Sequence, residues 1–185
     1  KGKFQGMENV ADDAGIIRAA AMDQRGSLKK SLALEKDISP EDITDEMMEE
    51  FKTAVIKVLS PYASGVLLDP EYGLKASQFR HSGVGLLMAY EKSGYDNTQG
   101  GRIPLLLPNW TVRQSLEAGA NCVKLLVYYS PFEESSINEQ KHAFVERIGA
   151  ECAFHDIPFF LEFVGYDSTG KLQGLDYARL KPEIV

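Results

Sequence analysis

Five short apolar runs alternate with helical segments along this chain, and this alternation constrains the fold more than any other feature. Parallel strands need a crossover before the next strand can pair, so repeated strand and helix units predict an α/β fold with a parallel sheet. Polar residues stand at or near the end of each run, which places them at the carboxyl ends of the strands. The predicted strands span residues 16–22, 65–71, 85–91, 121–129 and 157–164.

Helices are predicted between these strands from hydrophobic spacing and from start and stop signals. Residues 136–139 have the spacing of a capping box, and Asn109 or Thr111 caps a helix that ends at Gly119. Other helices are expected at 4–14, from 27 onward and at 175–180, with a loop over 165–174. The helix at 44–60 is amphipathic, with an apolar face of Met47, Phe51, Ala54, Val55, Val58 and Leu59.

Units of this kind either open into a doubly wound sheet or close into an eight-stranded barrel. A length of 185 residues favours the open sheet, since a closed barrel typically needs about 250. The glycine-rich dinucleotide fingerprint is missing, however, because the first predicted strand ends in Asp23-Gln24-Arg25-Gly26. Both architectures place ligands at the carboxyl ends of the strands, where the polar residues of this chain lie.

Two single charges interrupt otherwise apolar strands. Lys124 lies within the run 121–129, and Glu162 lies in an equally apolar run one strand later. A charged group in a buried strand must find a partner, water or a shifted pKa. A structural ion pair explains both residues, but with Asp23 they form three ionisable groups on three strands, which favours a common catalytic site.

Other polar residues at strand ends have two interpretations. Asp23 and Gly26 suit a turn and helix start, whereas Arg25 beside a helix start suits a phosphate or carboxylate ligand. Asp69 precedes a proline and is explained equally well by a turn. Candidate residues for lining the same mouth are Asp69, Glu71, Tyr90 and Glu91.

Charge and composition narrow the class of protein. A net charge of −7 argues against binding to duplex DNA or to an anionic membrane. No apolar run is long enough to cross a membrane, and two cysteines are too few for a disulfide framework, so a cytoplasmic setting is expected. The three histidines are scattered without ligand spacing, which predicts no zinc site. Serine and cysteine nucleophile motifs are absent as well.

Several segments of the sequence resemble the tagatose 1,6-bisphosphate aldolase family. The resemblance covers nearly the whole chain in order. It rests on Ala21-Met22-Asp23-Gln24-Arg25-Gly26-Ser27-Leu28-Lys29, on Leu67-Leu68-Asp69-Pro70-Glu71-Tyr72-Gly73, on Ala89-Tyr90-Glu91-Lys92-Ser93-Gly94-Tyr95-Asp96, on Val123-Lys124-Leu125-Leu126-Val127-Tyr128-Tyr129 and on Asp156-Ile157-Pro158-Phe159-Phe160-Leu161-Glu162.

This resemblance implies a (β/α)8 barrel and a class I mechanism, in which a lysine forms a Schiff base with a ketose bisphosphate and neither a metal nor a cofactor is needed. It implies that Asp23 assists carbonyl chemistry, that Lys124 supports the nucleophile electrostatically, and that Glu162 is the general acid and base. Gln24 and Arg25 become candidates for holding a substrate phosphate or hydroxyl.

One departure from the family pattern is expected to matter. The family's Schiff-base lysine lies on the sixth strand, and Lys171 and Lys181 do not match its motif. We therefore expect the chain to be a single-domain portion, the first five βα units of a longer enzyme, inactive alone and with two exposed sheet edges. The expected partner is a small sugar bisphosphate, with a homo-oligomer left open. The alternatives are a sulfosugar-phosphate aldolase, and a non-catalytic fragment or open-sheet domain that binds a sugar phosphate or a protein.

Overall fold

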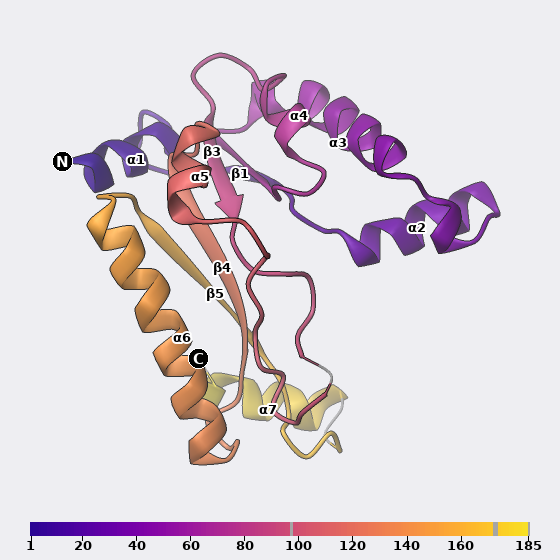
Figure 1. The fold of residues 1–185 in the computed structure, drawn as a ribbon, viewed down its shortest axis with the longest axis vertical. Helices are drawn as coiled ribbons and strands as arrows, with labels where there is room; N and C mark the ends of the chain where they lie inside the picture. Colours follow the sequence, from indigo (N-terminus) through magenta and orange to yellow (C-terminus); the bar gives the residue numbers. More distant parts are fainter. Residues whose placement is uncertain (97, 172–173, 185) are drawn as a thin grey trace.

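The computed structural model describes residues 1–96, 98–171 and 174–184, and it shows a curled five-stranded parallel sheet (Figure 1). The strands lie side by side in their sequence order, and every neighbouring pair is parallel. A doubly wound sheet requires a reversal of strand order, and none occurs here. The sheet is therefore half of a barrel, as the resemblance implies, and the open-sheet alternative is wrong. The strands are β1 (Ala19–Met22), β2 (Gly65–Leu68), β3 (Gly85–Ala89), β4 (Cys122–Tyr129) and β5 (Phe159–Gly165).

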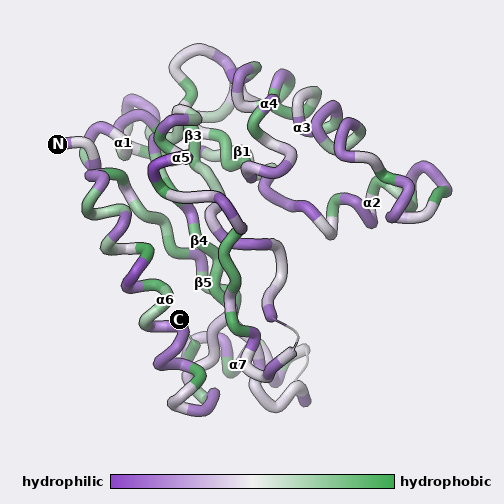
Figure 2. Tube along the Cα trace, in the orientation of Figure 1, coloured by the Kyte–Doolittle hydropathy of each residue, from purple (hydrophilic) through white to green (hydrophobic). Residues whose placement is uncertain are grey.

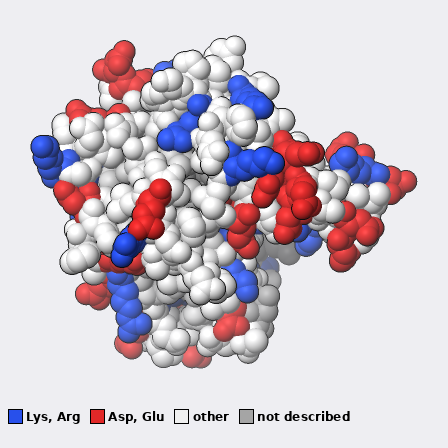
Figure 3. All heavy atoms as spheres, turned by 45° about the horizontal axis from the view of Figure 1, so that its top comes forward, with Lys and Arg blue, Asp and Glu red and all other residues white. Residues whose placement is uncertain are grey.

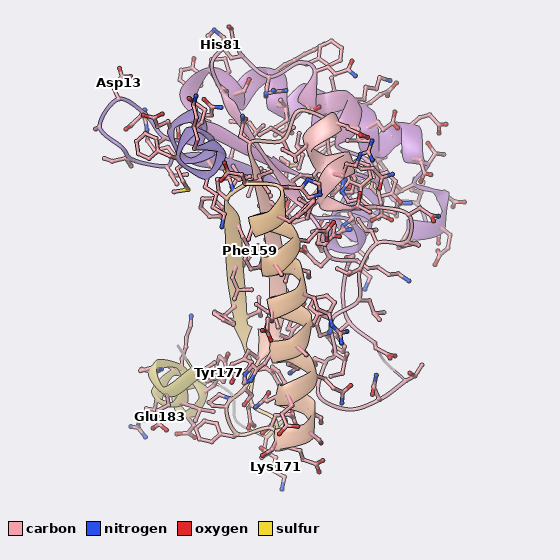
Figure 4. The ribbon with its side chains drawn as sticks, turned by 60° about the vertical axis from the view of Figure 1, so that its left-hand side comes forward. Asp13, His81, Phe159, Lys171, Tyr177 and Glu183 are labelled. Carbon is pink, nitrogen blue, oxygen red and sulfur yellow. The ribbon has the colours of Figure 1, made fainter. Side chains whose placement is uncertain are left out.

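Helices cover the outer face of the half-barrel, and α1 (Gly2–Val10) closes its base. The longest helix runs beside β4 and β5, and Figure 4 shows Phe159 at the start of β5 near it. The α2 helix (Gly26–Lys36) projects from the sheet (Figure 1). Acidic side chains gather on the surface at that end of the molecule (Figure 3). The helices are α1 (Gly2–Val10), α2 (Gly26–Lys36), α3 (Asp45–Leu59), α4 (Leu74–Ser77), α5 (Val112–Glu117), α6 (Ser135–Phe154) and α7 (Gly174–Ile184), with 3-10 turns at Pro40–Asp42 and Ser60–Tyr62.

Figure 2 shows that the strands are mostly apolar along their length. Their alternating side chains contribute to apolar clusters on both faces of the sheet. On the outer face of β4, Val123, Leu125 and Val127 pack with Ile148 and Cys152 of α6. A second outer cluster joins β2 and β3 to α3. On the inner face, Leu87 and Cys122 pack with Val10 of α1, which gives the barrel an apolar floor.

The floor depends on glycine where α1 meets the sheet. A Cβ on Gly85 would lie 2.3 Å from the carbonyl oxygen of Asn9, and a Cβ on Gly6 would lie 2.4 Å from that of Asn121. Both distances are far below van der Waals contact. Glycine therefore lets the helix backbone approach the strand backbones.

Several predicted boundaries are wrong. The first helix ends at Val10, because the side chain of Asp12 accepts backbone N–H groups of Ala14 and Ile16 and forms a turn. The first strand begins only at Ala19. The capping box is also wrong: α6 begins one residue before Ser136, and no side chain caps it. The Thr111 cap is confirmed, since its hydroxyl accepts the N–H of Gln114 at 3.1 Å.

The apolar face predicted for α3 is rotated in the structure. Val58 and Leu59 are 65% and 43% exposed, whereas Met48 and Ile56 are completely buried. Lys52 lies between them on the same face and is also completely buried. The helix therefore turns a lysine inward, for a reason that becomes clear at the candidate site. No helix in the described ranges is both long and apolar enough to cross a membrane.

The backbone contact at the floor predicts opposite effects for two glycine substitutions. Gly85→Ala should lower the free energy of unfolding of the full-length protein by about 1–3 kcal/mol, because α1 must move away. Gly149→Ala in α6 should raise it by up to about 1 kcal/mol, since alanine favours helix and the nearest atoms lie 4.0 Å away. Urea unfolding measures both, and equal effects would contradict the close approach at Gly85.

Candidate active site

A cavity opens at the carboxyl ends of β1, β3, β4 and β5. This is the end of a parallel barrel at which ligands bind. Six of the nine residues singled out from the sequence line it, and the structure adds five more. The lining residues are Asp23, Gln24, Arg25, Ser27, Glu91, Ser93, Gly94, Lys124, Leu126, Tyr128 and Glu162.

Lys124 is the centre of this cavity. It shares the inner face of β4 with Cys122, while Val123 and Leu125 face the helices. Its Nζ lies 2.8 Å from Asp23 and 2.8 Å from Glu162. The prediction that the two isolated strand charges meet is confirmed.

Three carboxylates surround the Lys124 ammonium, and they differ in exposure. The side chains of Asp23 and Glu91 are 13% and 7% exposed, whereas that of Glu162 is 51% exposed. The expectation of an apolar, buried setting for Glu162 is therefore wrong, because β5 is an edge strand and its inner face is open. All three carboxylates line the cavity, but only that of Glu162 is widely exposed to it.

The carboxylates decide the protonation of Lys124. Burial alone would lower its pKa, but the adjacent Glu91 and Asp23 charges outweigh burial and raise the pKa above the ordinary lysine range. A nucleophilic lysine needs the opposite shift, since only the free amine attacks a carbonyl. Lys124 is consequently a permanent cation at neutral pH.

Glu91 contributes more to this site than the sequence indicated. One carboxylate oxygen lies 3.4 Å from Lys124, and the other accepts the backbone N–H of Leu126 at 3.0 Å. Burial raises the pKa of Glu91, and the charge of Lys124 opposes that shift. Glu91 thereby joins the end of β3 to the middle of β4.

Arg25 is engaged by the protein itself. Its Nη1 donates to Glu71 at 2.8 Å, and its Nη2 donates to the carbonyl oxygen of Glu91 at 2.9 Å. The side chain is only 6% exposed. These contacts place Arg25 in the wall of the cavity, where it joins the ends of three strands, rather than free to face a phosphate.

Three candidates from the sequence do not reach the cavity. Glu71 is not among the lining residues, and its carboxylate accepts the hydrogen bond from Arg25 instead. Asp69 is completely buried and pairs with Lys52 of α3. The hydroxyl of Tyr90 donates to Glu151 of α6 at 2.8 Å, on the outer side of the sheet. Tyr90 and Glu91 are adjacent in an extended segment and point to opposite faces, so only Glu91 faces inward.

Lys52 was not among the residues predicted from the sequence, although the sequence contains a signal for it. It follows Met48 by four residues and precedes Ile56 by four, so it stands inside the buried stripe of α3. This is the helical equivalent of Lys124 inside an apolar strand. Strand periodicity singles out Lys124, and helical periodicity singles out Lys52 by the same argument.

Another buried lysine lies away from the cavity. The Nζ of Lys141 donates to the hydroxyl of Tyr166 at 3.0 Å, and burial lowers the pKa of Lys141 to about 8.

Within the described residues, neither Lys171 nor Lys181 lines the cavity. The same ranges hold no group of three or more His, Cys, Asp or Glu side chains arranged to hold a metal ion.

Known sequences that are similar to this chain are described as aldolases. A family model described as "DeoC/LacD family aldolase" matches residues 17–185. The chain is 49% identical to tagatose 1,6-diphosphate aldolase 2 of Enterococcus faecalis, over 100% of the chain and 55% of that protein. It is 51% identical to tagatose 1,6-diphosphate aldolase of Listeria monocytogenes, over 100% of the chain and 54% of that protein. The chain spans about half the length of the curated relatives it matches.

Solved structures share the fold at much lower sequence identity. A Schiff-base-forming fructose-1,6-bisphosphate aldolase superposes with a TM-score of 0.59 and 16% identity, covering 92% of this chain and 60% of that one. An archaeal fructose-1,6-bisphosphate aldolase with its catalytic lysine bound to a carbinolamine intermediate gives 0.58 and 15%, covering 92% and 59%. This likeness concerns the fold.

The charge balance around Lys124 predicts a pH-dependent loss of stability. Lys124→Met in the full-length protein leaves Asp23 without its ion-pair partner and leaves the Glu91 carboxylate with only Arg25, 3.6 Å away. This should cost about 3–5 kcal/mol of unfolding free energy at neutral pH. Glu91 already has a raised pKa, and the substitution raises it further. An acid with a raised folded-state pKa regains stability as pH falls, so the loss should be smaller near about pH 5.

Urea unfolding at the two pH values measures this effect. The matched control is Lys30→Met at an exposed position of α2, which should change stability by less than about 0.5 kcal/mol. A loss that stays constant or grows on acidification would contradict the arrangement of charges described above.

Proposed function

Because the chain belongs to the DeoC/LacD family of aldolases, we propose that the full-length protein is a class I aldolase that cleaves tagatose 1,6-bisphosphate. The observation that carries this proposal is a buried lysine ammonium held between carboxylates at the carboxyl ends of parallel strands, in a chain about half identical to two tagatose 1,6-diphosphate aldolases. The products are glyceraldehyde 3-phosphate and dihydroxyacetone phosphate.

We propose further that residues 1–185 are the amino-terminal part of a single (β/α)8 barrel. The strand order supports this, because five sequential parallel strands leave β1 and β5 as open edges. Three more strands would pair with both edges and close the barrel. The nucleophilic lysine is then expected on the sixth strand, outside the five strands seen here.

The proposed reaction begins when that lysine amine adds to the C2 carbonyl of the ketose and water leaves, which gives a protonated Schiff base. A base removes the proton of the C4 hydroxyl, the C3–C4 bond breaks, and its electron pair moves to the iminium to form an enamine. Glyceraldehyde 3-phosphate departs. Protonation of the enamine at C3 and hydrolysis of the imine then release dihydroxyacetone phosphate and the free lysine.

The contacts of the site suggest a role for each charged group. Glu162 is half-exposed to the cavity, so its carboxylate is able to reach a substrate hydroxyl as general base and acid. Lys124 stays protonated and lowers the pKa of a lysine placed near it, which keeps that amine free to attack. Asp23 holds the Lys124 ammonium and faces the reacting carbonyl.

Substrate contacts are proposed for the outer part of the cavity. Gln24 is exposed there and offers an amide to a substrate hydroxyl or phosphate. Arg25 acts mainly through Glu91, since its two terminal nitrogens are engaged. We make no such proposal for Asp69 or Tyr90, which do not line the cavity. A homo-oligomer and a cytoplasmic location stay predictions from the sequence.

Borohydride trapping tests the class I assignment. The full-length protein incubated with tagatose 1,6-bisphosphate and borohydride should acquire a stable adduct on one lysine, located by peptide mass spectrometry. Absence of an adduct on every lysine would refute the mechanism, and an adduct on Lys124 would refute its supporting role.

The substrate is decided by measuring turnover of tagatose 1,6-bisphosphate, fructose 1,6-bisphosphate and a sulfosugar phosphate side by side. A preference for the sulfosugar phosphate would favour the alternative of a sulfosugar-phosphate aldolase.

Removal of the half-exposed carboxylate should affect catalysis rather than folding. Glu162→Gln is expected to lower kcat roughly 10²- to 10⁴-fold, the usual contribution of a general acid or base, with little change in thermal stability. A coupled assay for glyceraldehyde 3-phosphate gives kcat and KM. Glu139→Gln at an exposed position of α6 is the matched control, and equal kcat values for the two variants would argue against the assigned role.

A further inference from the structure

A completely buried ion pair lies beneath the candidate active site. Lys52 of α3 and Asp69 after β2 are both 0% exposed, and their charged groups are in direct contact. Burial lowers the pKa of Lys52, and the charge of Asp69 opposes that shift. Burying two ions costs several kcal/mol each, so their retention calls for a physical reason.

Each member of the pair also binds backbone at the end of a strand. Lys52 Nζ donates to the carbonyl oxygen of Met22 at 2.8 Å, which is the last residue of β1. The second oxygen of Asp69 accepts the backbone N–H groups of Glu71 at 3.0 Å and Tyr72 at 2.8 Å. One pair therefore holds the ends of β1 and β2 against α3.

The hydrogen bond from Lys52 to Met22 connects the buried pair to the Lys124 ammonium through Asp23. Met22 precedes Asp23, so the Lys52 hydrogen bond restrains the backbone that carries the Asp23 carboxylate. Asp23 in turn lies 2.8 Å from Lys124. Movement of the end of β1 would therefore move one of the groups that hold Lys124.

The hydrogen bonds that Asp69 accepts connect the buried pair to Lys124 as well, through Glu71, Arg25 and Glu91. The turn organised by Asp69 presents Glu71, which accepts a hydrogen bond from Arg25 at 2.8 Å. Arg25 donates to the carbonyl oxygen of Glu91, whose carboxylate lies 3.4 Å from Lys124. Both routes thus begin at the buried pair and end at Lys124.

We propose that Lys52 and Asp69 are positioning residues that fix the place of the Lys124 ammonium through Asp23 on one side and Glu91 on the other. This inference rests on the proposed function for its catalytic meaning. The alternative is a pair that only stabilises the fold. The two accounts differ sharply, because an uncharged pair of similar size can replace a buried ion pair without loss of stability.

The test uses the double substitution Lys52→Met and Asp69→Asn in the full-length protein. Methionine keeps most of the buried stem, and asparagine keeps an oxygen for the N–H groups of Glu71 and Tyr72. We expect Tm to stay within about 4 °C of the parent. We also expect kcat to fall roughly 10- to 100-fold, with KM changed less than about threefold, since small misplacements of catalytic groups have effects of this size.

Lys57→Met is the matched control, an exposed lysine on the same helix, and it should leave kcat and KM unchanged. A double variant with the parent kcat would overturn the proposal, and so would a loss confined to KM. If the double variant does not fold, Asp69→Glu replaces it, because this change keeps both charges and shifts the carboxylate by one methylene. Here too a lower kcat supports the proposal and an unchanged kcat overturns it.

A crystal structure of the same variant separates this inference from the proposed function. Should the parent turn over none of the candidate ketose phosphates, the proposed function fails while the geometry remains testable. A shift of about 1 Å of the Asp23 carboxylate relative to Lys124 supports the positioning role. An Asp23 to Lys124 contact that stays at its parent distance of 2.8 Å overturns it.

Discussion

A lysine ammonium inside a barrel must be surrounded by carboxylates, and the rest of this site follows from that requirement. The effective penalty for burying an isolated ion is several kcal/mol, which attraction between opposite charges offsets only at close contact. Lys124 meets the requirement with Asp23 from the end of β1, Glu91 from the end of β3 and Glu162 from β5. The need to neutralise one charge therefore brings together a residue of β5 and residues that follow β1 and β3. Glu162, the half-exposed carboxylate of the three, lies on the open side.

The sequence contained enough information to find the centre of the site. Lys124 and Glu162 each break an apolar run, and strand periodicity puts both on the inner face of neighbouring parallel strands. Strand and helix alternation predicted the parallel sheet, whereas length alone pointed to the wrong architecture. The sequential strand order corrects that inference. The charged positions could be identified without it, since they follow from the apolar runs themselves.

The sequence pattern alone could not predict whether a side chain at the end of a strand faces into the barrel or towards the helices. The β3 strand is buried on both faces, so its sequence does not alternate, and nothing distinguishes the inward Glu91 from the outward Tyr90. The partners of Arg25 come from positions 46 and 66 residues away, which no local spacing encodes. The sequence left Asp69 as a turn residue or a residue of the cavity, and the structure shows the turn, with the backbone N–H groups of Glu71 and Tyr72 bound to its carboxylate. Its ion-pair partner Lys52 comes from a helix 17 residues earlier, so no local pattern around Asp69 indicates the pair.

The helix that forms the floor of the half-barrel has a consequence for the order of folding. Strands in sequence order pair mostly with the unit just completed, so the sheet is able to grow from β1 towards β5 as synthesis proceeds. The α1 helix is different. Its backbone N–H groups at Gly2 and Lys3 bind Asp156, more than 150 residues later, and its Gly6 rests against Asn121 and Pro158. The α1 helix can thus reach its final place only after the residues of β4 and β5 have been made, although it precedes all five strands of the sheet.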